Sequence, residues 1–457
     1  MQQQQENRMG TMPIKKLIVS ISLPMMISML VQALYNVVDS IFVSKINEAA
    51  LTAVTLAFPL QNMMIAVASG TGVGINALLS RALGEKRFEQ SNAAANKGIL
   101  LAFLSAVVFC IIGVVASEPF IASQANDALI AEYGTLYLSC VCIFSFGLFF
   151  QITFERLLQS TGNSIYSMIT QLTGAIINIV LDPILIFGYF GAPEMGVLGA
   201  AVATVIGQSV AAVIGLVLNL LKNKELHISL KSILASDAAT IRKIYIVGVP
   251  SILMMSIGSL MTYLMNLILM GFSSTATAVF GAYFKLQSFF FMPVFGLNNG
   301  LIPVLAYNYG AAHKNRIDEA LRFSVRLALS IMVLGMVVFL TLPNVLLGFF
   351  DASEEMLALG VPAMRTICLH FPIAAVCIAM SSVFQAFSQS VYSLIISVCR
   401  QLVVLIPAAW VLGQIGGVNA VWWSFLIAEF MSLALTILYF KRLYRTTIKP
   451  LEGVMHG

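Results

Sequence analysis

Two aspartates stand inside long apolar stretches, where a charged side chain is costly. Asp39 follows Tyr35 and Asn36 in a mainly apolar run, and Asp182 lies four residues after Asn178. An ionised side chain at the centre of a membrane helix costs about 2.5–3.5 kcal/mol on insertion scales. A carboxyl group removed from water binds a proton more readily, and a second carboxyl group nearby strengthens this effect. The two acids therefore predict a site for a proton or for Na⁺, in preference to polar groups that only join helices.

The residues around the second acid favour the same site. Asn178 and Asp182 share one face of a helix because they are four residues apart. Pro183 removes a backbone donor and leaves a carbonyl that can join a polar site. In the first apolar stretch, Pro24 marks a bend point before Asp39. Asp39, Asp182 and Asn178 are the predicted coupling site, or Na⁺ ligands, and Pro24 is the predicted bend.

Other ionisable residues in apolar stretches leave alternatives open. Lys285 and Arg400 either bind backbone carbonyls or repel cations and shape a cavity. Glu155 is interpreted as a snorkelling or locally paired group, and His370 as a packed histidine in preference to a proton relay. The role of Glu429 stays undecided.

A substrate cavity is predicted from the abundance of soft and aromatic side chains. The chain has 23 Met and 30 Phe residues, and such surfaces re-pack around varied ligands, although ordinary packing accounts for most of them. The candidate cavity or substrate contacts are Tyr35, Asn36, Gln61, Gln287, Lys285, Met292 and Arg400. The sequence offers no ATP-binding motif, metal-ligand spacing or paired nucleophile and base, so we expect no cofactor, no resident metal and no enzyme activity. The energy source would be an H⁺ or Na⁺ gradient.

The elements that position these residues are membrane helices. Of 457 residues, 59% are apolar and 10% are charged, whereas soluble domains carry about 25% charged residues. This composition excludes soluble enzymes and nucleic-acid binders. A spanning helix needs about 20 mainly apolar residues, and helices satisfy the backbone polar groups in lipid. Twelve stretches qualify, at roughly 15–43, 49–80, 97–117, 130–158, 164–190, 195–221, 240–271, 277–306, 320–350, 356–388, 391–413 and 417–442.

The positions of the cations predict the orientation of these spans. Twenty of the 25 Lys and Arg residues fall in the tails and in the alternate connections on one side. Cytoplasmic connections carry an excess of Lys and Arg. We therefore expect a multi-pass protein of the cell membrane with both termini in the cytoplasm.

The two halves of the chain repeat at an offset of 226 residues. Pro24 pairs with Pro250, Gln61 with Gln287, and Leu158-Gln159 with Phe384-Gln385. Matches at one offset indicate duplication, and two six-span halves predict pseudo-twofold-related lobes around a central cavity, as in alternating access. The predicted domains are a tail at 1–14, an N-lobe at 15–221, a linker at 222–239, a C-lobe at 240–442 and a tail at 443–457.

Several motifs together resemble the multidrug and toxic compound extrusion (MATE) family, most closely its bacterial DinF/MepA-like branch. The resemblance covers nearly the whole chain. Its residues are Asn36–Val43, Gly84, Leu158–Asn163, Asn178–Pro183, Gln287–Asn299, Tyr307–Ala311 and Arg400–Leu402.

The resemblance implies an antiporter that exports organic, often cationic, drugs or dyes in exchange for H⁺ or Na⁺, working as a monomer in the bilayer without nucleic acid. It places the coupling site in the N-lobe at Asp39, Asp182 and Asn178, and matches Pro24 to a bend-forming proline. NorM-like members also carry acids on the seventh and tenth helices. Here Leu260–Met270 has no acid and the tenth span offers only His370, so coupling through the C-lobe is not expected.

Three alternatives remain. A lipid-linked saccharide flippase of the same wider superfamily would have a more cationic cavity, which Lys285 and Arg400 would support. A channel would pass ions without substrate. An intramembrane enzyme would need a nucleophile and a base facing the cavity.

Overall fold

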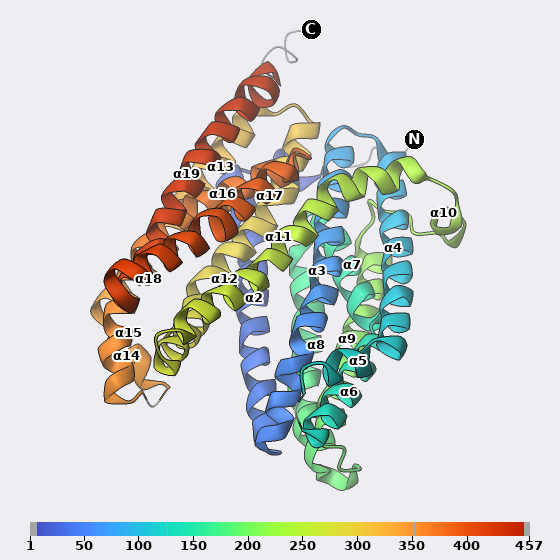
Figure 1. Ribbon diagram of the computed structural model, residues 1–457. Helices are drawn as coiled ribbons and strands as arrows, with labels where there is room; N and C mark the ends of the chain where they lie inside the picture. The colour runs from blue at the N-terminus through green and yellow to red at the C-terminus, as the bar shows by residue number, and fades with distance from the viewer. Residues whose placement is uncertain (1–6, 126, 351, 452–457) are drawn as a thin grey trace. The chain divides into compact units, whose positions relative to one another are not determined.

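The computed structural model describes residues 7–125, 127–350 and 352–451, so the ends of the two expected tails lie outside the described residues. Within these ranges all regular structure is helical (Figure 1), which confirms the expected all-α class. The first half contains α1(Arg8–Thr11), α2(Ile14–Ser44), α3(Glu48–Gly84), α4(Phe88–Val115), α5(Ser117–Ala122), α6(Ala128–Ile143), α7(Phe146–Ser160), α8(Ser164–Phe187), η1(Tyr189–Gly191), α9(Val197–Lys222) and α10(Leu230–Leu234).

The second half has a similar succession of helices. It contains α11(Ala238–Met270), α12(Ser274–Gly310), α13(Lys314–Thr341), α14(Pro343–Gly348), α15(Glu354–Ile367), η2(Cys368–His370), α16(Phe371–Ala386), α17(Ser390–Val398), the π-helical η3(Cys399–Leu405), α18(Ile406–Val421), α19(Trp423–Leu443) and η4(Tyr444–Ile448).

The described residues provide the expected membrane spans, one of them in two pieces. Eleven helical segments are long and apolar enough to cross a membrane. The stretch expected at 130–158 is instead α6 and α7, which meet at a bend of 47° and make a twelfth span if they are taken together. The break falls at Phe144 and Ser145.

The helix bounds and turns confirm the duplication. α3 and α12 each have 37 residues, and α4 and α13 each have 28, with starts and ends 226 residues apart. The turns that follow repeat a left-handed residue, Lys86 with φ 58° and Ala312 with φ 57°. Gly162 and Ser388 form a second such pair, with φ 85° and 59°. The two halves therefore share backbone geometry as well as hydrophobic pattern.

The chain divides into two compact units that do not simply follow its order. The N-unit is Ile27–Ile252, and the C-unit combines the residues up to Met26 with those from Leu253 onward. Pro24 in α2 and Pro250 in α11 each lie two residues before such a division. Each of these two long helices therefore belongs to both units, whereas the expected lobes at 15–221 and 240–442 keep each helix whole.

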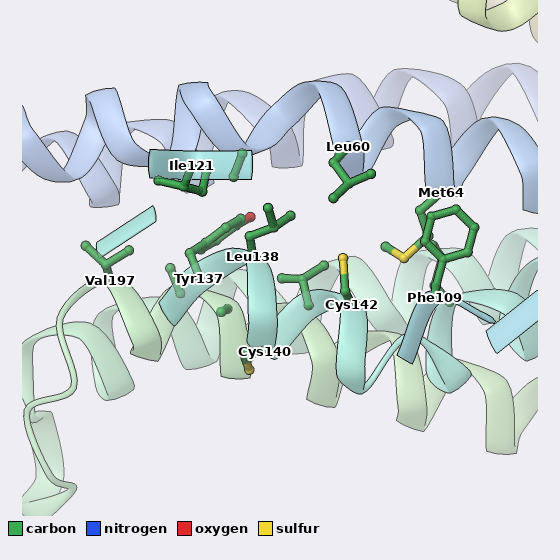
Figure 2. Packing of buried hydrophobic residues seen from close by; sticks show 14 of the residues in the cluster. Leu60, Met64, Phe109, Ile121, Tyr137, Leu138, Cys140, Cys142 and Val197 are labelled. Atoms are coloured by element: carbon green, nitrogen blue, oxygen red, sulfur yellow. The ribbon is translucent and has the colours of Figure 1, made fainter. Parts of the chain in front are cut away.

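A cluster of buried side chains packs the helices of the N-unit against one another. Figure 2 shows Leu60 of α3, Phe109 of α4, Tyr137 and Cys142 of α6, and Val197 of α9 packed together; all are buried. Because lipid tails are as apolar as these side chains, van der Waals packing and not removal from water holds such helices together in a membrane. This cluster fixes α3, α6 and α9 as the scaffold of the functional site.

Candidate functional site

The N-unit brings the two predicted acids together. Asp39 comes from α2 and Asp182 from α8, and their side chains lie within hydrogen-bonding reach of each other. Asp182 is fully buried and Asp39 is half-buried. One oxygen of each carboxyl group is buried without a hydrogen-bond partner among the described residues. Two carboxylates at such close range repel each other, so the pair favours uptake of a proton or a cation.

Asn178 connects the acid pair to α9. Its amide is satisfied at both ends when the nitrogen donates to Asp182 Oδ2 at 3.3 Å and the oxygen accepts from Thr204, at 3.2 Å from the hydroxyl and 3.1 Å from the backbone nitrogen. Asn178 and Thr204 are both buried. Because a buried amide is costly to leave unpaired, this chain of hydrogen bonds fixes the position of Asp182.

Close packing of α8 and α9 makes that chain possible. A Cβ atom on Gly207 would lie 2.7 Å from the backbone oxygen of Gly174 and 3.3 Å from Asn178 Cβ. A Cβ atom on Gly174 would lie 3.1 Å from the backbone oxygen of Gly207. The pair of glycines thus lets the two backbones approach, as small residues do at membrane helix interfaces.

Two tyrosines lie near the acid pair. Tyr35 of α2 and Tyr137 of α6 interact electrostatically with both Asp39 and Asp182. The Tyr137 hydroxyl donates to Gln61 Oε1 at 3.5 Å, which brings that residue to the edge of the site. Asn36 is exposed on α2.

Sequence reasoning missed Thr204 and Tyr137. Each is one hydroxyl residue within an apolar span, and the chain has 13 tyrosines, so neither carried a distinguishing signal. Thr204 is identified by the packing of α9 against α8, and Tyr137 by its electrostatic interaction with the two acids.

The remaining predicted contacts belong to the C-unit. Lys285 is exposed on α12, and Gln287 and Met292 are half-buried on the same helix. Arg400 lies in η3 and pairs with Glu429 of α19 at 3.3 Å. The sequence analysis did not predict a carboxylate partner for Arg400. Arg400 and Glu429 are 29 positions apart, so their spacing gave no indication that they are in contact.

The two residues with open roles in α7 and the tenth span have defined partners. Glu155 is buried and accepts a hydrogen bond from Gln151 at 3.0 Å, one helical turn away. His370 is buried, and its Nε2 lies 3.2 Å from the hydroxyl of Tyr283. Glu155 is therefore locally bonded and does not snorkel, and His370 packs within a polar cluster.

Comparisons with known proteins agree with this architecture. A family model described as MatE matches residues 24–184 and again 250–411, so each half matches separately. Multidrug export protein MepA of Staphylococcus haemolyticus (strain JCSC1435) is 26% identical over 427 residues, 93% of each chain. A solved outward-facing multidrug resistance MATE family transporter of the MOP superfamily is similar, with TM-score 0.91, 24% identity and coverage of 99% of this chain and 100% of that one.

A crystal structure of MATE in the straight conformation is also similar, with 25% identity, TM-score 0.90 and coverage of 98% of both chains. The structural likeness confirms the fold, and the sequence matches extend over nearly the whole chain. Because the family model matches both halves, which together make up well over half of the residues, this multi-pass membrane protein belongs to the MatE family.

Proposed function

We propose that the protein exports small organic compounds, many of them cationic, from the cell in exchange for protons bound at Asp39 and Asp182. It would act as a monomer in the cell membrane with both termini in the cytoplasm. Membership of the MatE family and the relative named as a multidrug export protein support transport over catalysis.

The acid pair carries this proposal. Asp39 and Asp182 meet inside a bundle of apolar helices, and each keeps one carboxyl oxygen without a partner among the described residues. Their neighbours Asn178, Tyr35 and Tyr137 are amide and hydroxyl groups, which do not neutralise two negative charges. A bound proton or cation would supply the missing positive charge.

A proton is the simpler coupling ion for this acid pair. Two carboxyl groups within hydrogen-bonding reach can share one proton without any further ligand. Na⁺ would require additional oxygen ligands. Asn178 can turn either its amide oxygen or its amide nitrogen toward Asp182, so its position is compatible with both ions.

Proton binding would act on α2. Protonation removes the repulsion between Asp39 and Asp182 and lets the two side chains approach. Pro24 removes one hydrogen bond from the interior of α2, so the helix can bend there at low cost. We propose that this bend changes the surface of the N-unit and releases the exported compound.

The test uses everted membrane vesicles with ethidium as the substrate and an acid-interior or a Na⁺-loaded gradient imposed separately. The intact protein should accumulate ethidium with the proton gradient, and Asp39→Asn and Asp182→Asn should each reduce this at least tenfold. Asp127→Asn is the matched control, because Asp127 caps α6 by accepting from the Leu129 amide and Asn caps a helix equally well. Ethidium transport retained in Asp39→Asn would contradict the coupling role, and accumulation only with the Na⁺ gradient would identify Na⁺ instead.

The flippase alternative loses part of its support. It relied on Lys285 and Arg400 as free positive charges, and Arg400 is neutralised by Glu429 at 3.3 Å. Ethidium accumulation in neither gradient, with normal membrane insertion, would favour this alternative.

A further inference from the structure

A second buried polar cluster lies in the C-unit. It is formed by other residues than the acid pair, and it contains basic as well as acidic side chains. Glu429 of α19 places one carboxylate oxygen, Oε2, 3.3 Å from Arg400 Nη1 and 3.6 Å from His370 Nδ1. The side chains of Glu429 and His370 are 3% and 7% exposed, and that of Arg400 is 28% exposed. Two basic groups therefore face a single oxygen, and one of them reaches partway to the surface.

His370 is held in place from its other side. Its Nε2 lies 3.2 Å from the Tyr283 hydroxyl, and its ring packs against Phe291, Phe371 and Phe425. These aromatic rings form an apolar wall that limits access of water to the imidazole. In this orientation of the ring, Nδ1 faces Glu429.

The other elements packed against His370 bring few further ionisable groups to it. α13 contributes Phe339, which contacts Tyr283 and Phe371, and Arg365 of α15 donates to the backbone oxygen of Leu340. Among the described residues, the ionisable groups that contact His370 are Tyr283 and Glu429. Arg400 pairs with Glu429, Cys368 interacts electrostatically with Tyr283, and Cys377 does so with Glu429 and Arg400.

One nitrogen of the cluster lacks a hydrogen bond among the described residues. Nδ1 of His370 is buried and makes no hydrogen bond among the described residues, although the carboxylate oxygen is 3.6 Å away. Tyr283 and Nε2 can exchange donor and acceptor roles, depending on the tautomer of the imidazole. In the tautomer with its proton on Nε2, Nε2 donates to the Tyr283 hydroxyl and a bare Nδ1 lies opposite Glu429. A proton on Nδ1 would turn this contact between two acceptors into a charge-assisted hydrogen bond.

Arg400 is the partner that could be released. It belongs to a π-helical segment, a widened turn that is frequent at functional sites. Its side chain is 28% exposed and that of Glu429 is 3% exposed, so Arg400 is the member of the ion pair with room to move.

We propose that His370, Glu429 and Arg400 form a second proton-binding site, in which a proton taken up at His370 Nδ1 replaces Arg400 as the partner of Glu429. One proton enters from solution, one N–H bond forms on the imidazole, and Arg400 loses its carboxylate partner. This goes beyond the proposed function, because it concerns the C-unit and holds or fails independently of the role of Asp39. It also departs from the sequence-based interpretation of His370 as a packed histidine.

The experiment is solid-state NMR of the full chain in liposomes with ¹⁵N-labelled histidine, over about pH 5–8. The His370 resonance among the four histidines is identified by its loss in His370→Gln. We expect the Nδ1 resonance to change from that of a bare nitrogen to that of a protonated nitrogen as the pH falls. Arg400→Gln should strengthen proton binding about tenfold, because the competing cation is gone. Glu429→Gln should weaken binding, because the stabilising carboxylate is gone.

Tryptophan fluorescence gives a second readout specific to the C-unit. All three tryptophans, Trp410, Trp422 and Trp423, lie in this unit. A fluorescence transition at the same midpoint should disappear in His370→Gln and persist in Asp39→Asn. The proposal is overturned if His370 keeps one protonation state over this range, or if it titrates with a midpoint that Arg400→Gln leaves unchanged. Arg400 is partly exposed, so this variant keeps the test available if Glu429→Gln does not fold.

Discussion

Adding one methyl group to Gly207 should disturb both the stability of the N-unit and the candidate site. In Gly207→Ala the new Cβ would lie 2.7 Å from the Gly174 backbone oxygen and 3.3 Å from Asn178 Cβ. Both atoms are on α8, and the oxygen belongs to backbone that cannot rotate away. The collision therefore forces α9 away from α8 by several tenths of an ångström. Thr204, three residues before Gly207 on the same face of α9, moves with it.

The expected magnitude follows from overpacking. Extra methyl groups in a well-packed interior cost about 1–3 kcal/mol. Gly174→Ala should cost less than Gly207→Ala, because its nearest contacts are Ala211 Cβ at 3.0 Å and the Gly207 oxygen at 3.1 Å. Gly281→Ala in α12 is the matched control, since a Cβ there meets nothing within 4 Å and alanine favours a helix by up to about 1 kcal/mol.

The assay compares the free energy of unfolding of the purified variants in mixed micelles, together with ethidium accumulation in vesicles. The predicted order of stability is Gly281→Ala, then Gly174→Ala, then Gly207→Ala. Transport should fall in Gly207→Ala even at temperatures where the variant stays folded, because Thr204 no longer positions Asn178. Equal stability of Gly207→Ala and Gly281→Ala would refute the reasoning from close approach of the two helices.

Two further predictions concern the connections between helices. Lys97 is buried and donates to the backbone oxygens of Ser232, at 2.9 Å, and Ile233, at 2.8 Å. Lys97→Met should leave these carbonyls unpaired and lower the free energy of unfolding of α10 by about 1–3 kcal/mol. Faster trypsin cleavage at Lys231 would show this loss. The repeat positions Gly162 and Ser388 both have positive φ, which is unfavourable for a residue with a Cβ atom. Gly162→Ser should therefore lower the free energy of unfolding by about 1–2 kcal/mol, whereas Ser388→Gly should leave it unchanged or raise it slightly. A lower free energy of unfolding in both variants would contradict this argument from positive φ.

Much of the fold follows from the sequence because lipid restricts the choices. Apolar stretches of sufficient length predict the helices, and the offset between Pro24 and Pro250 predicts the duplicated order of elements. Two features were not predictable in this way. The break between α6 and α7 falls within an apolar run, and the exchange of the first parts of α2 and α11 between the two units depends on tertiary packing.

The site was predictable only as far as charge in an apolar stretch is conspicuous. Asp39 and Asp182 stood out, and Asn178 followed from helical spacing. Thr204 belongs to the site through the approach of α9 to α8, and hydroxyl residues are common in membrane helices. Glu429 was conspicuous too, but its partners come from other helices, so its role could not be assigned without the fold.

The duplication separates what the scaffold requires from what each unit does chemically. At the offset of 226, the counterparts of Asp39 and Asp182 are Met265 and Ala408, and the counterpart of Glu429 is Ala203. The repeated turns keep their geometry, whereas the buried charges have no equivalents in the other half. The acid pair lies among uncharged neighbours and so calls for a positive charge from outside. Glu429 already has Arg400, so an incoming proton there can only change which group pairs with it. The acid pair and the Glu429 cluster are therefore two different kinds of site on one duplicated fold. Variants in one should leave proton binding at the other unchanged.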